Sequence, residues 1–169
     1  FTNGARFPLG IKPQNLNGNY NYNDGVSNQL AKWKSLGILE NNTPANINAV
    51  VNYKDTTKPL ETRVRSYFDA NCAHCHQTGG YASFFNLKFG FNETSNLTSM
   101  GVCVSPNHIV PGMEGRIVKP GNLTQSLLYF RVTTNDPNYR MPFLGRTIVH
   151  DEGVALIAEW INSITECPN

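Results

Sequence analysis

Apolar residues recur at helical spacing over 151–165, and this is the clearest pattern in the sequence. The residues of this stripe are Val154, Ile157, Ala158, Ile161 and Ile164, widened by Leu156 and Trp160. A stripe that returns every three or four residues is typical of a helix with one face in a core. The pattern predicts a helix over 151–165 that Asp151 caps and that ends before Pro168.

A second helix is predicted over 60–75. Val64, Tyr67 and Phe68 fall on one face of this segment, which we expect to turn inward. Pro59 directly precedes the segment, and proline is common where a helix starts.

Shorter helical patterns predict two more helices, over 24–40 and 122–130. Asp24 stands at the start of the first pattern as a candidate cap, and Trp33 lies on its apolar face. Asn122 opens the second pattern, with a glutamine three residues later in a loose capping-box arrangement.

The remaining segments are rich in Gly, Pro and Asn, which favour turns. Residues 1–23 lack a helical period and predict an extended arm anchored by apolar side chains. The anchors are Phe1, Phe7, Leu9, Ile11 and Leu16. Alternation of apolar residues between Phe85 and Phe91 allows either a short strand or a covering loop.

Composition excludes two classes of function. Of the 169 residues 15% are charged, the formal net charge is +2, and no basic run occurs, so we expect no nucleic-acid partner. No stretch approaches about 18 consecutive apolar residues, so we expect no transmembrane helix. No signal peptide is visible at Phe1, and we therefore expect a mature or excised piece.

The candidate chemistry centres on the sequence Cys-Ala-His-Cys-His at 72–76. On a helix its two cysteines and final histidine lie at i, i+3 and i+4, and so share one face. Two thiols on that face can add across the vinyl groups of a haem, and the imidazole can ligate the iron. The spacing therefore predicts one covalent c-type haem on Cys72, Cys75 and His76.

Two other sites use the same cysteine spacing. One is a zinc site in which Cys103 and His108 join Cys72 and Cys75 as ligands. The other is a thioredoxin-like redox dithiol, which requires a βαβ context that the sequence does not suggest.

An iron ligated by His76 has a second axial position. The candidate ligands are Met100, Met113, Met141, His74, His108 and His150. Met141 is favoured, because Pro142 restricts its backbone to extended values in a loop ahead of the last helix. The predicted metal ligands are thus His76 and Met141. His108 is the main alternative and would give a bis-histidine iron.

Two further cysteines remain, Cys103 and Cys167. In an oxidising compartment such a pair suggests a disulfide. It would close a loop of about 65 residues and stabilise the fold by about 4 kcal/mol. The alternative is two separate buried thiols.

In the order of these motifs the chain resembles the class I, monohaem cytochromes c. The matching residues are the 72–76 motif at the end of a helix, then Met141-Pro142, then a terminal helix that contains Trp160. Position 88, where the family usually has a proline whose carbonyl accepts the ring N–H of the haem histidine, is Lys88.

This resemblance implies a fold and a domain division. The expected fold is mainly α, a cytochrome c fold around one covalently bound haem. Residues 58–169 would form the haem domain, with a long loop insertion over 86–119. Residues 1–57 would be an irregular N-terminal extension packed on that core.

The resemblance also implies a function. We expect one-electron transfer to or from a partner redox protein or fused domain, with no catalytic residues. Two alternatives are a peroxidase-like haem enzyme with a displaceable sixth ligand, and a zinc-structured binding module. The resemblance to secreted bacterial redox proteins implies a periplasmic or extracellular monomer. Candidate partners of the haem propionates are Arg140, Arg146 and Trp160.

Overall fold

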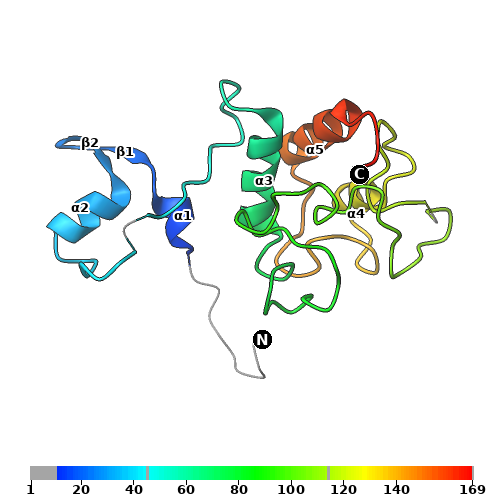
Figure 1. Cartoon of the computed structure of the whole chain (residues 1–169), viewed down its shortest axis with the longest axis horizontal. Coiled ribbons are helices and arrows are strands. Elements are labelled where there is room, and N and C mark those ends of the chain that lie inside the picture. The colour runs from blue at the N-terminus through cyan, green and yellow to red at the C-terminus, as the bar shows by residue number, and fades with distance from the viewer. Residues whose placement is uncertain (1–10, 45, 114, 169) are drawn as a thin grey trace. The chain divides into compact units, whose positions relative to one another are not determined.

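The computed structural model describes residues 11–44, 46–113 and 115–168. Its contacts divide the chain between Val51 and Asn52 into two compact units (Figure 1). The sequence-based boundary was placed six residues later, after residue 57. Packing of the N-terminal extension on the haem domain stays a prediction.

The unit that ends at Val51 contains a β-hairpin between two short helices (Figure 1). Its elements are α1 (Pro13–Leu16), β1 (Asn19–Tyr22), β2 (Gly25–Asn28) and α2 (Gln29–Ser35). The strands are antiparallel, and Tyr22 pairs with Gly25, which leaves a two-residue loop between them.

The predicted extended arm and the predicted helix over 24–40 are both wrong in part. Asp24 lies in the hairpin loop rather than at a helix start, and Gly25 follows it with φ +116°, a value that favours glycine. The cap of α2 is Asn28, whose Oδ1 accepts a hydrogen bond from the Ala31 N–H at 3.1 Å. The Asn-Asp-Gly signal of a hairpin therefore overrides the helical spacing upstream of Asn28. The anchors Phe1, Phe7 and Leu9 lie outside the described residues.

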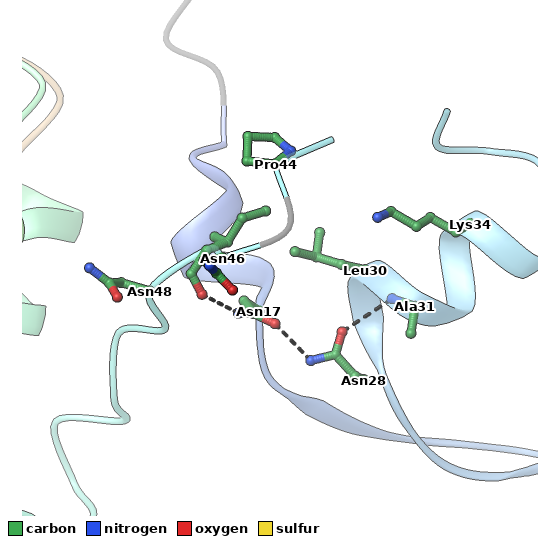
Figure 2. Close-up of a pocket in the computed structure, with 9 residues that line it drawn as sticks. Asn17, Asn28, Leu30, Ala31, Lys34, Pro44, Asn46 and Asn48 are labelled. Carbon is green, nitrogen blue, oxygen red and sulfur yellow. Dashed lines mark hydrogen bonds between the residues drawn. The ribbon is translucent and has the colours of Figure 1, made fainter. Parts of the chain in front are cut away.

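A polar pocket lies within this unit (Figure 2). The Asn17 amide donates to the carbonyl of Ile47 at 2.6 Å, and the Asn28 amide donates to Asn17 Oδ1 at 2.9 Å (Figure 2). The side-chain amides of this pocket therefore form a hydrogen-bonded network. The network connects the segment around Ile47 to the hairpin and to the start of α2.

The second unit is built on three helices (Figure 1). They are α3 (Leu60–Asn71), α4 (Leu127–Thr133) and α5 (Asp151–Ser163), and α5 contacts both of the others. Within the core the ring of Phe68 lies edge-on to Trp160 at 5.8 Å and tilted against Phe89 at 4.6 Å. The apolar faces predicted for 60–75 and 151–165 therefore form this core in the main, although Val154 and Ala158 are only half-buried and lie outside the cluster.

Gly153 of α5 lies against the side chain of Tyr67 of α3. A Cβ at position 153 would lie 2.0 Å from the Tyr67 hydroxyl oxygen. Glycine weakens a helix interior by about 1 kcal/mol relative to alanine, so its presence here reflects the lack of space.

A long segment without helices runs from 72 to 126. Within its described residues no strand forms, and the alternating residues from Phe85 to Phe91 are loop. Two isolated bridges, Val102 with Val118 and Arg116 with Ser126, order part of it.

The predicted disulfide is present. Cys103 in this loop is joined to Cys167 after α5, with an S–S distance of 1.98 Å. The bond is compatible with an oxidising compartment. Among the residues that the structure describes, no helix has the length and apolar character that crossing a membrane requires.

The expected mainly α fold is wrong. Of the residues that the structure describes, only 28% are helical, in five helices, and the two strands of the hairpin form a small sheet. The N-terminal extension is not irregular, because it contains the hairpin and two of the helices. The predicted helices are also shorter than expected: α2 covers Gln29–Ser35, α3 Leu60–Asn71, α4 Leu127–Thr133 and α5 Asp151–Ser163.

Candidate cofactor site

The predicted attachment motif forms a hydrogen-bonded turn that directly follows α3. The helix ends at Asn71, not at Cys75 as predicted, but its last turn is continued by further bonds. The Cys72 N–H donates to the Phe68 carbonyl at 2.8 Å, and the His76 N–H donates to the Cys72 carbonyl at 3.0 Å. The second bond spans four residues, as in an α-helix, so the two thiols and the imidazole belong to one turn.

The turn is fixed to the core by Ala73. This side chain is fully buried and belongs to the same apolar cluster as Phe68 and Trp160. The position of the motif is therefore set by packing as well as by backbone bonds.

Both thiols of the motif are free. Burial, with a smaller effect of the neighbouring Cys75, raises the pKa of Cys72 to about 12. Burial also raises the pKa of Cys75. A catalytic dithiol instead needs a thiol with a lowered pKa, so the thioredoxin-like alternative finds no support here.

His76 carries a neutral imidazole. Burial lowers its pKa to about 4, and nearby positive groups, including Lys88 and Arg131, add to the shift. Neutral imidazole is the form that ligates a metal.

One nitrogen of this imidazole has no partner. Nδ1 of His76 is buried and makes no hydrogen bond within the described part of the chain. The ring packs edge-on against Phe89 at 5.5 Å, and the Phe89 N–H donates to the His76 carbonyl at 2.7 Å. The carbonyl acceptor that the cytochrome family provides from a proline is thus not supplied by the segment around Lys88.

The Met141 loop lies between α4 and α5 and is anchored by arginines. The Met141 N–H donates to the Arg131 carbonyl at 2.8 Å, and Arg146 Nη1 donates to the Met141 carbonyl at 2.5 Å. The Met141–Pro142 peptide is cis. Met141 makes no hydrogen bond with the 72–76 turn in the described structure. Arg131 is the residue common to both, since its charge acts on His76 and its carbonyl binds Met141.

The other candidate axial ligands have different environments. Met100 is fully buried in the apolar core. Nδ1 of His150 binds the Tyr67 hydroxyl at 2.9 Å, and its Nε2 lies 3.1 Å from Glu152. His108 is exposed, with its ring edge-on to Phe85 at 5.7 Å, and remains the main alternative to Met141.

The alternative zinc site lacks one of its four proposed ligands. Cys103 is consumed by the disulfide and so cannot supply a thiolate beside Cys72 and Cys75. Across the described ranges, no group of three His, Cys, Asp or Glu side chains could hold a metal ion.

Large apolar side chains stand exposed within eight residues after each predicted iron ligand. Tyr81 and Phe84 follow His76 and are 66% and 73% exposed. Phe143 and Leu144 follow Met141 and are 58% and 75% exposed. Such residues are usually buried, and a porphyrin has a broad apolar face. The two free thiols, the neutral imidazole of His76 and these exposed apolar side chains therefore fit a haem, whereas Nδ1 of His76 lacks the acceptor that the cytochrome family provides.

No protein-family model, curated protein or solved structure matches this chain. The resemblance to class I cytochromes c accordingly stays a prediction, carried by the motif residues.

The structure adds one residue that the sequence did not suggest. Arg131 on α4 lies just beyond the helix predicted over 122–130, and the link that it makes between His76 and Met141 depends on the course of the loop. Burial lowers the pKa of Arg131. Burial and the charge of Arg140 lower that of Arg146. Arg131, Arg140 and Arg146 thus place three cationic side chains close to the Met141 loop.

Proposed function

We propose that this chain transfers electrons through one c-type haem attached to Cys72 and Cys75, with His76 and Met141 as axial ligands. The observation that carries the proposal is the turn closed by the His76 N–H and the Cys72 carbonyl. It keeps two free thiols and one neutral imidazole together. When bound, the haem supplies an iron that cycles between the ferric and ferrous states.

The protein groups have distinct roles in this proposal. Cys72 and Cys75 would hold the haem covalently, each through a thioether bond made when its S–H adds across one vinyl group. His76 donates a ring nitrogen to the iron. Met141 would supply a thioether sulfur as the second iron ligand, which favours ferrous iron and would leave no ready site for oxygen or peroxide. A saturated iron is suited to electron transfer rather than to catalysis.

The compartment and partner follow from the same chemistry. Covalent haem attachment and the Cys103–Cys167 disulfide both suit a periplasmic or extracellular protein of a bacterium. The electron partner is a redox protein or a fused domain. With a formal net charge of +2, we expect docking without strong electrostatic steering.

Optical spectra of single variants test the axial ligands. The ferric wild-type holoprotein should show the weak far-red band of sulfur-to-iron charge transfer. Met141→Ala should lose this band while it keeps covalent haem, and His108→Ala should retain it. Loss of the band in His108→Ala alone, or rapid binding of cyanide by the wild type, would contradict ligation by Met141.

A further inference from the structure

Three arginines surround the Met141 loop without a carboxylate partner. They are Arg131, Arg140 and Arg146. None forms an ion pair with Asp or Glu in the described parts of the chain, where the ion pairs involve other cations. A partly buried cationic group without an anion is costly, so the cluster needs a partner.

The backbone already binds the guanidinium of Arg146. Its Nε donates to the Ile148 carbonyl at 3.2 Å, and Nη1 donates to the carbonyls of Met141 and Arg131. Nη2 donates to the Thr134 carbonyl. Arg146 therefore holds the loop together and has little capacity for a ligand.

Arg140 differs from Arg146. Its Nε is buried and makes no hydrogen bond within the described residues. An unsatisfied buried donor costs about 1–3 kcal/mol, so an acceptor is expected at this point. The guanidinium fork matches the two oxygens of a carboxylate or of a phosphate, and a haem carries carboxylates in its propionate groups.

Arg131 lies close to Arg140. Its Nη1 donates to the Tyr139 carbonyl at 2.9 Å, and its own carbonyl accepts from the Met141 N–H. Arg131 thus contacts the residues on both sides of Arg140. Trp160, the other candidate partner, is only 2% exposed within the core and is not available.

We infer that Arg140, supported by Arg131, forms a carboxylate-binding site whose ligand is a propionate group of the haem. The inference rests on the proposed function. Arg140 directly precedes the predicted ligand Met141, so a propionate bound there would also fix the haem relative to this loop. The sequence gives no acidic residue nearby in the chain that could serve instead, apart from Asp136, whose Oδ1 binds Asn138.

The test is the midpoint potential of the holoprotein in three variants. A positive charge beside the haem favours the ferrous state, so Arg140→Gln should lower the potential while the covalent haem bands remain. Arg140→Lys keeps the charge but not the fork, and its potential should lie between the two. Arg116→Gln is the control, because Arg116 is exposed and already donates to Ser105 Oγ at 2.6 Å. It should retain the wild-type potential.

Several outcomes overturn the inference. Equal potentials in the wild type, Arg140→Gln and Arg140→Lys would do so. If Arg140→Gln does not fold, a wild-type potential in Arg140→Lys is sufficient to reject it. Added citrate should not move the wild-type potential, since a covalently held propionate fills the site. A citrate-dependent potential would mean that the site takes a free carboxylate. Absence of covalent haem from the wild type would instead reject the proposed function itself.

Discussion

The crossing of α3 and α5 and the two segments that carry the proposed iron ligands are built by opposite means. At the crossing, Phe68 and Trp160 are buried in an apolar cluster, and Gly153 admits Tyr67 without a gap. In the loops, backbone carbonyls and arginines fix the chain, while large apolar side chains such as Leu144 remain exposed. At the crossing the side chains bury one another and need no further group. The loops leave polar nitrogens buried and apolar groups in water, which is the arrangement that a cofactor with both apolar and acidic groups would complete.

The largest expected effect concerns the crossing. Trp160→Ala should lower the free energy of unfolding by about 4 kcal/mol, because it removes a buried aromatic side chain and leaves a cavity. Urea unfolding followed by circular dichroism measures this loss. The matched variant Leu144→Ala, in the exposed loop, should change stability by less than about 0.5 kcal/mol. Similar losses in the two variants would remove the distinction between the regions.

Gly153→Ala tests the closeness of the crossing. By helix propensity alone the change would stabilise α5 by about 1 kcal/mol. Because the new Cβ would lie 2.0 Å from the Tyr67 hydroxyl oxygen, we expect a net loss of about 1–3 kcal/mol. The same substitution in a Tyr67→Ala background should cost less, because only His150 Nδ1, 2.8 Å from the new Cβ, would then remain close. An equal loss in both backgrounds of a double-mutant cycle would show that Tyr67 does not set the limit.

The pH dependence of the apoprotein tests the burial of His76. Its pKa is about 4 in the folded state, against about 6.5 in an unfolded chain. Between these values the unfolded state binds more protons, so stability falls as the pH drops from 6.5 to 4. Since the side chain is partly exposed, we expect a loss of about 1–2 kcal/mol rather than the full value.

The control for this effect is a second histidine. In protein made without haem attachment, His76→Gln should reduce the loss of unfolding free energy between about pH 6.5 and 4, that is, on the acid limb of the stability profile. His108→Gln should leave that limb in place, since His108 is exposed. An unchanged acid limb in His76→Gln would show that another group carries the effect.

The smallest effect on stability is expected at the exposed apolar side chains. Phe143→Ser should change the stability of the apoprotein by less than about 0.5 kcal/mol, because the side chain is already 58% exposed. In the holoprotein the same change should lower the midpoint potential, since a more polar surrounding favours ferric iron. A potential equal to that of the wild type would place Phe143 outside the haem environment.

The sequence predicted the apolar faces of α3 and α5, because apolar residues that recur at helical spacing over a long segment indicate a buried face whatever element packs against it. It did not predict the hairpin around Asp24, since Val26, Leu30 and Trp33 share a helical spacing that the turn at Asn23–Gly25 overrides. The mainly α interpretation failed for the same reason and because much of the chain between 72 and 126 is loop.

Only part of the candidate site could be predicted from the sequence alone. The motif at 72–76 is local, so its spacing was sufficient to predict one turn. The role of Arg131 was not, because it depends on a loop that returns to α4 and binds Met141. Burial of an arginine nitrogen, as in Arg140, likewise has no signature in the pattern of residues.

Covalent attachment of haem to the 72–76 turn is the central claim, and a matched pair of proteins tests it most directly. The wild type and Cys72→Ser/Cys75→Ser would be produced in a bacterial periplasm with the haem-attachment machinery. After denaturation and acidic solvent extraction, the reduced pyridine complex of each polypeptide would be measured in the visible range. We expect c-type bands that stay with the wild-type polypeptide and are missing from the double variant. A wild-type polypeptide without these bands would contradict the proposal.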